Sequence, residues 1–327
     1  MNRFEVITPA DVASASRLLA EDGYVALAGG VDVVDLSKQN IVSPPTLVNL
    51  KGLKELGGIE LRSSGDLRLG ATVKLSEVAE HPAIRAKFTA IAEAAGEAAT
   101  PQIRNLGTVG GNLLQRPRCW YFRNPDMLCL KKGGDTCYSI GGLNRYHAIL
   151  GGGPSFIVHP SNLAPALIAM RASATIVGPA GQRTVELEKF FTLPTVDPKR
   201  ENSLKPGEII TEVIVPAPSA GVRSHYLEAR EKQSFDWPLV SVAIVLDGGT
   251  TIRDARVVMG AVAPVPWRSL EAEAALKGGP LDESRARSAA EAALKDAQPT
   301  SDNAYKVVIA KVILRRAIMH TAGLEAA

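Results

Sequence analysis

One segment limits the possible folds of this chain more than any other: residues 116–158, which interrupt an otherwise regular hydrophobic pattern. All three cysteines lie there with many glycines, and no helical or strand period is visible. A structureless loop of this length is uncommon in a compact domain unless something ties it together. Disulfides would come in pairs and spread along the chain, so an odd number of clustered cysteines favours a metal or cluster site.

The spacing of the thiols, Cys119-x9-Cys129-x7-Cys137, differs from the compact ligand runs of common metal sites. Zinc fingers place cysteines about two to four residues apart, and bacterial ferredoxins use a similarly short run. Three buried structural cysteines are an alternative, because free cysteine packs as a small apolar residue. The absence of cysteine elsewhere in the chain favours ligands.

The composition is that of an ordinary globular protein, with 46% hydrophobic and 22% charged residues in a chain of 327. A net charge of +3 without a long basic run argues against nucleic acid and acidic membranes as partners. The first residues show no secretory signal, and no apolar stretch is long enough for direct membrane insertion. We expect a cytoplasmic protein, which a partner's signal could export to the periplasm in folded form.

Outside the cysteine segment the pattern predicts helices and strands of ordinary length. We expect a first helix with Thr8 as N-cap and Pro9 at its first position. Further helices are expected at 31–38, 83–99 and 162–172, strands at 24–28, 46–50 and 174–177, and a hairpin at 59–61 and 67–69. A Pro/Gly/Ser-rich junction at 216–221 indicates a domain boundary. Beyond it, strands at 239–246 and 252–263 precede helices at 270–276, 283–297 and 302–321, a pattern typical of an α+β domain.

Two glycine pairs, Gly29-Gly30 and Gly110-Gly111, are candidates for binding an anion. Adjacent glycines let backbone N–H groups converge on a phosphate, and the first pair also stands where a strand ends and a helix begins. Glycine pairs also form simple tight turns, which is the alternative for each. Neither a G-x-G-x-x-G run nor a Walker lysine accompanies them, so the common Rossmann and P-loop interpretations fit poorly.

Several motifs, in this order, resemble the flavin subunit of the xanthine dehydrogenase/aldehyde oxidoreductase family of molybdenum hydroxylases. They are Leu27-Ala-Gly-Gly-Val-Asp-Val-Val34, Arg104-Asn-Leu-Gly-Thr-Val-Gly-Gly-Asn-Leu113, His159-Pro-Ser-Asn-Leu-Ala-Pro-Ala166, Leu204-Lys-Pro-Gly-Glu-Ile-Ile210, Phe235-Asp-Trp-Pro-Leu-Val-Ser-Val-Ala243 and Met259-Gly-Ala-Val-Ala-Pro264. The resemblance covers essentially the whole chain. Motifs in a fixed order are more specific than any one of them alone.

The resemblance implies an α+β fold: a two-subdomain FAD-binding unit of the vanillyl-alcohol oxidase-like type over 1–218, and a smaller α+β C-terminal domain over 219–327. It implies that one loop wraps the FAD pyrophosphate, a second loop contacts the cofactor, position 162 faces its flavin side and position 204 packs near the isoalloxazine ring. The residues concerned are Leu27, Ala28, Gly29, Gly30, Val31, Asp32, Val33, Val34, Thr108, Gly111, Asn112, Asn162 and Leu204.

Two positions depart from the family's pattern. Asn162 stands where the family usually has aspartate, and Glu228 stands where lysine is common. An amide still forms hydrogen bonds, but one negative charge is lost at position 162. A reversed charge at position 228 disfavours an anionic reduced flavin if it lies near the ring. The departures therefore predict FAD binding with altered redox tuning.

A subset of the family, including 4-hydroxybenzoyl-CoA reductase and the periplasmic aldehyde oxidoreductases, carries a [4Fe–4S] cluster on an insertion at this place. Cys119, Cys129 and Cys137 resemble its first three ligands, and the insertion spans about 116–158. The fourth ligand would fall at Tyr146 in the reductase type or at Ser155 in the oxidoreductase type. Neither hydroxyl is a donor comparable to a thiolate. Three outcomes are open: a favoured [4Fe–4S] cluster with an oxygen or histidine fourth ligand, a [3Fe–4S] cluster, or an empty structural loop.

The resemblance implies an oxidoreductase subunit that passes electrons between partner [2Fe–2S] clusters and an external acceptor. Its partners would be a molybdopterin-binding large subunit and a [2Fe–2S] small subunit, and no catalytic residue is expected here because substrate oxidation occurs on another chain. A non-redox scaffold with a degenerate flavin fold is the alternative. A free-standing oxidase of the vanillyl-alcohol type fits less well, because no substrate domain with its own base or covalent flavin ligand is visible.

Overall fold

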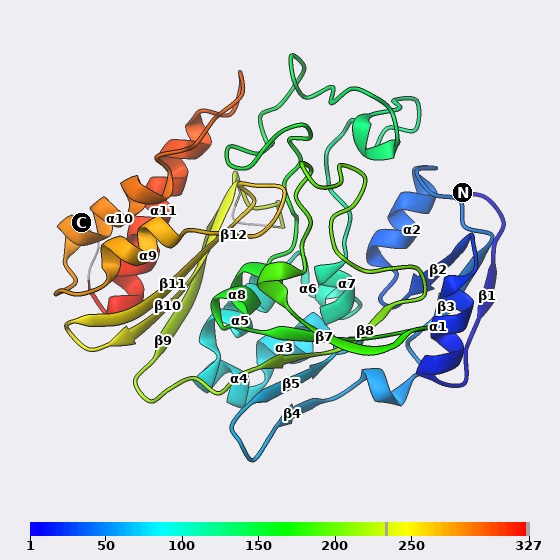
Figure 1. Cartoon of the computed structure of the whole chain (residues 1–327), viewed down its shortest axis with the longest axis horizontal. Helices are drawn as coiled ribbons and strands as arrows, with labels where there is room; N and C mark the ends of the chain where they lie inside the picture. Colours follow the sequence, from blue (N-terminus) through cyan, green and yellow to red (C-terminus); the bar gives the residue numbers. More distant parts are fainter. Residues whose placement is uncertain (233–234, 325–327) are drawn as a thin grey trace.

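Three sheets, each covered by helices, organise the molecule (Figure 1). The computed structural model describes residues 1–232 and 235–324. The α+β fold expected from the sequence is confirmed, and the C-terminal part of the chain forms a sheet of its own. Within the described residues, no helix has the length and apolar character needed to cross a bilayer.

The N-terminal sheet is parallel and has the order β1-β3-β2. Its elements are β1 (Glu5–Ile7), α1 (Val12–Ala20), β2 (Tyr24–Leu27), α2 (Val31–Lys38) and β3 (Thr46–Asn49). The predicted N-cap of the first helix is wrong, since Asp11 caps α1 instead of Thr8. The Asp11 carboxylate accepts a bond of 2.6 Å from the Ser14 N–H, and Ser14 Oγ accepts one of 3.1 Å from the Asp11 N–H. This reciprocal pair satisfies two helix donors at once, which one threonine could not do.

The middle sheet is antiparallel, with the order β4-β5-β8-β6-β7. Its strands are β4 (Ile59–Leu61), β5 (Leu67–Gly70), β6 (Ser173–Gly178), β7 (Gly181–Glu186) and β8 (Ile209–Val215). Its helices are α3 (Leu75–Glu80), α4 (Pro82–Lys87), α5 (Thr89–Glu97), α6 (Pro101–Arg104), α7 (Val109–Leu113) and α8 (Leu163–Ala169). Short 3₁₀ turns lie at η1 (Lys54–Leu56), η2 (Leu130–Lys132) and η3 (Leu187–Lys189).

The single helix expected over 83–99 is instead two helices, α4 and α5. They break at Phe88, which has φ −128° and ψ 46° and a completely buried side chain. Packing of this ring in the main core overrides the helix propensity of the alanine-rich run around it.

The C-terminal sheet is antiparallel, with the order β12-β11-β10-β9. Its elements are β9 (Arg223–Ala229), β10 (Val240–Gly248), β11 (Ile252–Gly260), β12 (Trp267–Arg268), α9 (Leu270–Leu276), α10 (Glu283–Ala293) and α11 (Tyr305–Ala322). Helix α11 packs against β9 and β10, and α9 packs against β11. Helix α8 connects this sheet to the rest, because it contacts β10 and β11 as well as α5 and is buried along its whole length.

The cysteine segment has almost no regular structure, as expected, and contains only the η2 turn. In Figure 1 it forms the teal-to-green loops at the top of the view, between α2 on one side and α11 on the other. The order of this segment must therefore come from tertiary contacts.

Replacing the α8 core residue Leu167 by alanine should lower the free energy of unfolding by about 2–5 kcal/mol, because its fully buried side chain leaves a cavity. Urea unfolding of the purified chain measures this change. The matched control Val196→Ala, at a side chain 79% exposed, should change stability by less than about 0.5 kcal/mol. Equal effects of both substitutions would contradict the central packing role of α8.

Candidate cofactor site

The two glycine pairs lie on loops that pack against each other. A Cβ on Gly29 would stand 2.2 Å from the carbonyl oxygen of Leu106 and 3.2 Å from the Cα of Gly107, so only glycine fits there. Gly30, with φ +77°, is the N-cap of α2 and provides no side-chain cap. The first N–H groups of α2 therefore remain available to an anion, at the positive end of the helix dipole. Free N–H groups at a helix start, beside a second glycine loop, are a geometry that can bind an anion.

The second loop is fixed to the start of α8 by side-chain hydrogen bonds. Thr108 caps α7 by accepting a bond of 3.1 Å from the Gly111 N–H. Asn112 Oδ1 accepts bonds from Ser161 Oγ at 2.6 Å and from the Leu163 N–H at 3.3 Å. The fold thus brings the second loop to Asn162, the N-cap residue of α8.

The two residues that depart from the family's pattern contact each other. Asn162 Nδ2 donates to Glu228 Oε2 at 3.0 Å, and Tyr226 donates to the same oxygen at 2.7 Å. Arg230 forms an ion pair with Glu228 and reaches Glu97 Oε2 at 2.9 Å. Burial raises the pKa of Glu228, and its hydrogen bonds with Tyr226 and Arg230 oppose this rise. The reversed charge is therefore compensated within the protein.

Leu204 lies apart from the loop contacts. It follows Asn202, whose Oδ1 accepts a bond of 3.1 Å from the Leu204 N–H, and its half-buried side chain packs against the main core. The contacts described above bring the two glycine loops and Asn162 together. Leu204 packs elsewhere, in the main core just before β8.

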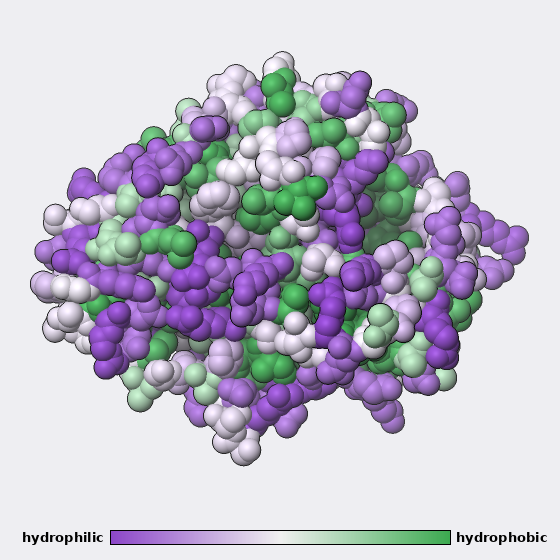
Figure 2. Space-filling view, in the orientation of Figure 1, coloured by the Kyte–Doolittle hydropathy of each residue, from purple (hydrophilic) through white to green (hydrophobic). Residues whose placement is uncertain are grey.

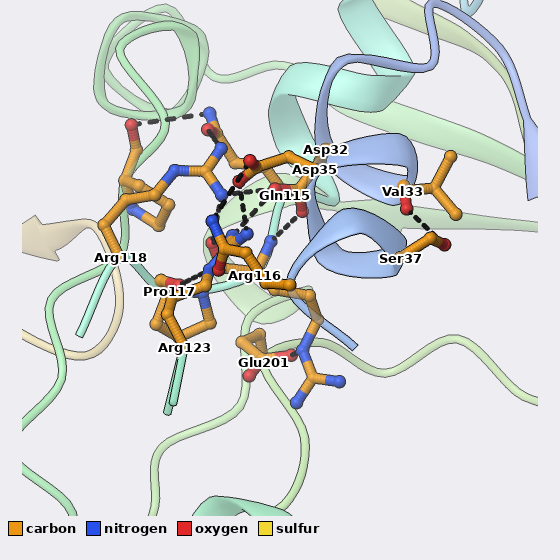
Figure 3. A network of polar contacts seen from close by, with 12 residues as sticks. Asp32, Val33, Asp35, Ser37, Gln115, Arg116, Pro117, Arg118, Arg123 and Glu201 are labelled. Atoms are coloured by element: carbon orange, nitrogen blue, oxygen red, sulfur yellow. Dashed lines mark hydrogen bonds and ion pairs between the residues drawn. The ribbon is translucent and has the colours of Figure 1, made fainter. Parts of the chain in front are cut away.

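Asp32, from the first glycine loop, binds the cysteine segment (Figure 3). Its carboxylate forms an ion pair with Arg118, accepts a bond of 2.8 Å from Arg123, and accepts one of 2.7 Å from the backbone N–H of Arg116. Arg123 also binds Asp35 at 2.9 Å. No local sequence pattern predicts this network, because its partners are more than eighty positions apart in the chain.

Glu201 provides a second anchor for the same segment. Its Oε2 lies 2.8 Å from Arg116 Nε, and its Oε1 lies 2.8 Å from Nζ of the buried Lys131. Lys131 also donates to the carbonyl oxygen of Pro198 at 3.0 Å. Arg116 precedes Cys119 and Lys131 follows Cys129, so these contacts fix the segment on either side of the two cysteines.

The three cysteines are free thiols that gather in the same region. Cys119 packs against a small group of buried apolar side chains, which are Cys129, Phe122 and Leu36. Burial chiefly, and the nearby thiols of Cys137 and Cys129 to a smaller extent, raise the pKa of Cys119 to about 11, although backbone hydrogen bonds at Phe122 and Tyr121 oppose the rise. Among the described residues, no three His, Cys, Asp or Glu side chains converge on a point that could hold a single metal ion.

The candidates for a fourth ligand lie in different surroundings. Tyr146 is 38% exposed, and its ring packs edge-on to Trp120 with centroids 5.7 Å apart. Ser155 is buried. Within the described part of the chain, neither hydroxyl has a hydrogen bond to any of the three thiols.

His147, in contrast, contacts a cysteine directly. Its Nε2 lies 3.2 Å from Cys119 Sγ, while its Nδ1 is buried without a hydrogen-bond partner in the described structure. Burial, and secondarily the charge of Lys306, lower the pKa of His147 to about 4, so the ring is neutral near pH 7. A thiol and a neutral imidazole therefore lie in contact here, and both are side chains that bind transition metals.

A cavity of about 250 Å³ lies beside this group, lined by Cys119, Trp120, His147, His159 and Trp237 among others. His159 Nε2 is likewise buried without a partner in the described structure. Burial lowers the pKa of His159 to about 3. The cavity therefore borders the Cys119 thiol and two neutral imidazoles.

Comparisons with known proteins match both parts of the chain. Residues 2–218 match the FAD binding domain in molybdopterin dehydrogenase, and residues 224–321 match the CO dehydrogenase flavoprotein C-terminal domain. The aldehyde oxidoreductase FAD-binding subunit PaoB of Escherichia coli (strain K12) is 36% identical over 312 residues, which cover 94% of this chain and 93% of that protein. The carbon monoxide dehydrogenase medium chain of Hydrogenophaga pseudoflava is 28% identical over 97% of this chain and 96% of its own length.

A solved structure agrees with these matches. A carbon monoxide dehydrogenase from Hydrogenophaga pseudoflava, which lacks the Mo-pyranopterin moiety of the molybdenum cofactor, superposes with a TM-score of 0.77 at 27% identity, over 98% of each chain.

Replacing Gly29 by alanine should abolish retention of the cofactor, because the new methyl group would displace the Leu106 carbonyl and with it the second loop. The flavin absorbance of the purified chain measures this loss. Gly249→Ala is the matched control, since a Cβ there meets nothing within 4 Å. Full flavin content in the Gly29 variant would refute the proposed role of the first loop.

Folding stability should decrease as the pH falls from about 6.5 toward 3, because unfolded His159 binds a proton that the folded, buried ring excludes. At about pH 5 the loss from this one group is on the order of 2 kcal/mol. His159→Gln should reduce the slope in urea unfolding measured from pH 7 to pH 5, and the buried His147, whose pKa is also lowered, should account for part of the slope that stays. His320→Gln, at an exposed histidine, should keep the wild-type slope. A pH-independent wild-type stability would contradict the neutral buried state.

Proposed function

The chain belongs to the family of FAD-binding flavoproteins of molybdopterin dehydrogenases, and we propose that it relays electrons through FAD between a partner's clusters and an external acceptor. It is an oxidoreductase subunit, as its relatives are. The observation that carries the proposal is the contact between the two glycine loops, which only glycine at position 29 permits.

We assign FAD to the residues expected from the sequence: 27–34, Thr108, Gly111, Asn112, Asn162 and Leu204. Bound FAD would supply the electron chemistry, and the protein would supply binding and electrostatics. The uncapped N–H groups of α2 would hold the pyrophosphate. Asp32 would contribute only its backbone to the cofactor, because its carboxylate is already bound by arginines. This arrangement keeps an anionic side chain away from the phosphates.

Near the flavin, Asn162 and Glu228 would act as one unit. The amide, the Tyr226 hydroxyl and the Arg230 guanidinium all bind the Glu228 carboxylate, so its charge does not face the cofactor unshielded. We therefore expect the two departures to retune the flavin moderately and not to prevent its reduction.

The partners proposed are a molybdopterin-binding large subunit and a [2Fe–2S] small subunit, with substrate oxidation on the large one. Support comes from the surface of the cysteine segment, where Leu128, Ile140 and Leu143 are 62%, 57% and 66% exposed. Figure 2 shows hydrophobic groups interrupting the polar surface in the upper part of the molecule, where this segment lies in Figure 1. Apolar side chains concentrated on one segment are typical of a surface that a partner covers.

We further propose that the cysteine segment binds an iron–sulfur cluster through Cys119, Cys129 and Cys137. A cluster is ligated at separate iron atoms, so its ligands need not converge on one point as the ligands of a single ion do. Iron would replace the thiol protons, so binding of the cluster would release protons. A [4Fe–4S] cluster remains favoured over [3Fe–4S] because an additional donor lies beside Cys119.

The domain division after residue 218 fits the connection between β8 and β9, which runs from Val215 to Arg223. We propose it as the boundary of the FAD-binding unit. The cytoplasmic location and the export of the chain with a partner stay predictions.

Purified anaerobically with its partners, the chain should contain stoichiometric FAD, which denaturation releases and which substrate of the complex bleaches. Flavin absorbance before and after addition of substrate measures both properties. A complex that oxidises substrate but contains no flavin would favour the scaffold alternative. Flavin that is bound but never reduced would contradict the electron relay.

A further inference from the structure

We propose that Arg118 and Arg123 of the cysteine segment are positioning residues for FAD, which neutralise two carboxylates at the start of α2 and join the two glycine loops. The inference rests on the FAD binding proposed above and deepens it, because it gives the cysteine segment a part in retaining the cofactor. The contacts that carry it involve none of the three cysteines, so it holds with or without an iron–sulfur cluster.

The start of α2 carries negative side chains where the pyrophosphate would bind. Asp32 lies in the first turn of the helix, and Asp35 follows one turn later. A helix N-terminus attracts an anion with a charge equivalent to only about half an elementary charge. Two unpaired carboxylates this close would outweigh that attraction, because like charges a few ångströms apart repel strongly at a protein surface. The loop therefore needs compensating positive charge before it can hold a phosphate.

Two guanidinium groups supply this compensation. Arg118 forms an ion pair with Asp32, and Arg123 binds Asp32 at 2.8 Å and Asp35 at 2.9 Å. The Arg123 side chain is only 9% exposed, so solvent and salt screen these pairs weakly. The planar fork of an arginine can bind two carboxylates in a fixed geometry, which the single ammonium group of a lysine does not reproduce. The helix dipole of α2 is then no longer opposed by its own acidic side chains.

Arg118 also connects the first glycine loop to the second. Its guanidinium group donates to Gln115 Oε1 at 3.0 Å. Gln115 Nε2 in turn donates to the carbonyl oxygens of Asn112 at 3.0 Å and Pro160 at 3.4 Å. Figure 3 draws Arg118 together with Asp32 and Gln115. Because Asn112 belongs to the second loop and Asp32 to the first, one arginine side chain joins both loops.

The two guanidinium groups are themselves held by the backbone of the segment. Arg123 Nε donates to the carbonyl oxygen of Pro117 at 2.8 Å. The carbonyl oxygen of Arg116 accepts further bonds from Arg123 at 3.2 Å and from Arg118 at 3.3 Å. The positive charges therefore have fixed places before any ligand arrives, which is the preorganisation that a binding site requires.

The test measures binding of FAD and of ADP, which carries a pyrophosphate without the flavin, to the full-length apoprotein. Flavin fluorescence follows FAD, and titration calorimetry follows ADP. The double variant is Arg118→Gln with Arg123→Gln, and the triple variant adds Asp32→Asn. The matched control is Arg145→Gln, at an exposed arginine of the same segment whose ion pair is with Glu231.

We expect the double variant to bind both ligands at least about tenfold more weakly, because uncompensated carboxylates then stand beside the phosphates. The triple variant should recover about threefold or more of that loss, because it removes one of those charges. The control should keep the wild-type affinity. A purely structural role of the arginines predicts no recovery, since the triple variant has lost one more set of contacts.

Wild-type affinity in the double variant, or a triple variant that binds no better than the double, would overturn the inference and leave the flavin function intact. If circular dichroism shows that the double variant does not fold, Arg123→Gln is compared with Arg123→Gln/Asp32→Asn in the same way, since both keep Arg118. A folded wild-type chain that binds neither FAD nor ADP would refute the FAD assignment itself.

Discussion

The arrangement of this protein depends on the ion pairs between Asp32 and the arginines of the cysteine segment. Asp32 belongs to the loop proposed to bind phosphate, and its side chain is only 17% exposed where it meets Arg123, itself 9% exposed. A buried ion pair of this kind contributes little net stability, but removal of one partner leaves an uncompensated charge and is costly. The ion pair therefore contributes by fixing the position of the segment and adds little to stability. It fixes the first part of the irregular segment to α2, so the cofactor loop and the thiols have one relative placement.

The far part of the segment is fixed by a different chemistry. Lys306 and Asn303 bind the backbone around His147, and Asn144 binds the turn before α11. The segment is thus attached to the N-terminal sheet region at one end and to the C-terminal helices at the other, and its cysteines lie between. This explains how a stretch without secondary structure is ordered within the fold, and it makes the segment a bridge between the two parts of the flavoprotein. The placement of the three cysteines then follows from both anchors together.

The contact between Asn162 and Glu228 shows that the two departures from the family's pattern belong to one site. Taken one at a time, each removes or reverses a charge that the family places near the flavin. In the structure the amide donates to the carboxylate, and Tyr226 and Arg230 complete its hydrogen bonds. The pair therefore forms a satisfied polar unit, which is the condition for keeping a buried carboxylate without a large penalty. A matched exchange of two partners is easier to accommodate than either change alone.

Local patterns were sufficient for much of the fold. The sequence predicted α2 and α9 with their observed bounds, and the alternation of apolar residues predicted the hairpin of β4 and β5. The motifs in their fixed order identified the family. Local patterns failed where the deciding partner is distant in sequence. The break at Phe88 depends on a core that other elements build, the carboxylate of Asp32 is taken by arginines far along the chain, and His147 reaches Cys119 across an aperiodic stretch. The order of the motifs thus determined the family and the fold class. Tertiary packing alone decided which side chains of the irregular segments meet, because contacts between such segments leave no periodic signal in the sequence.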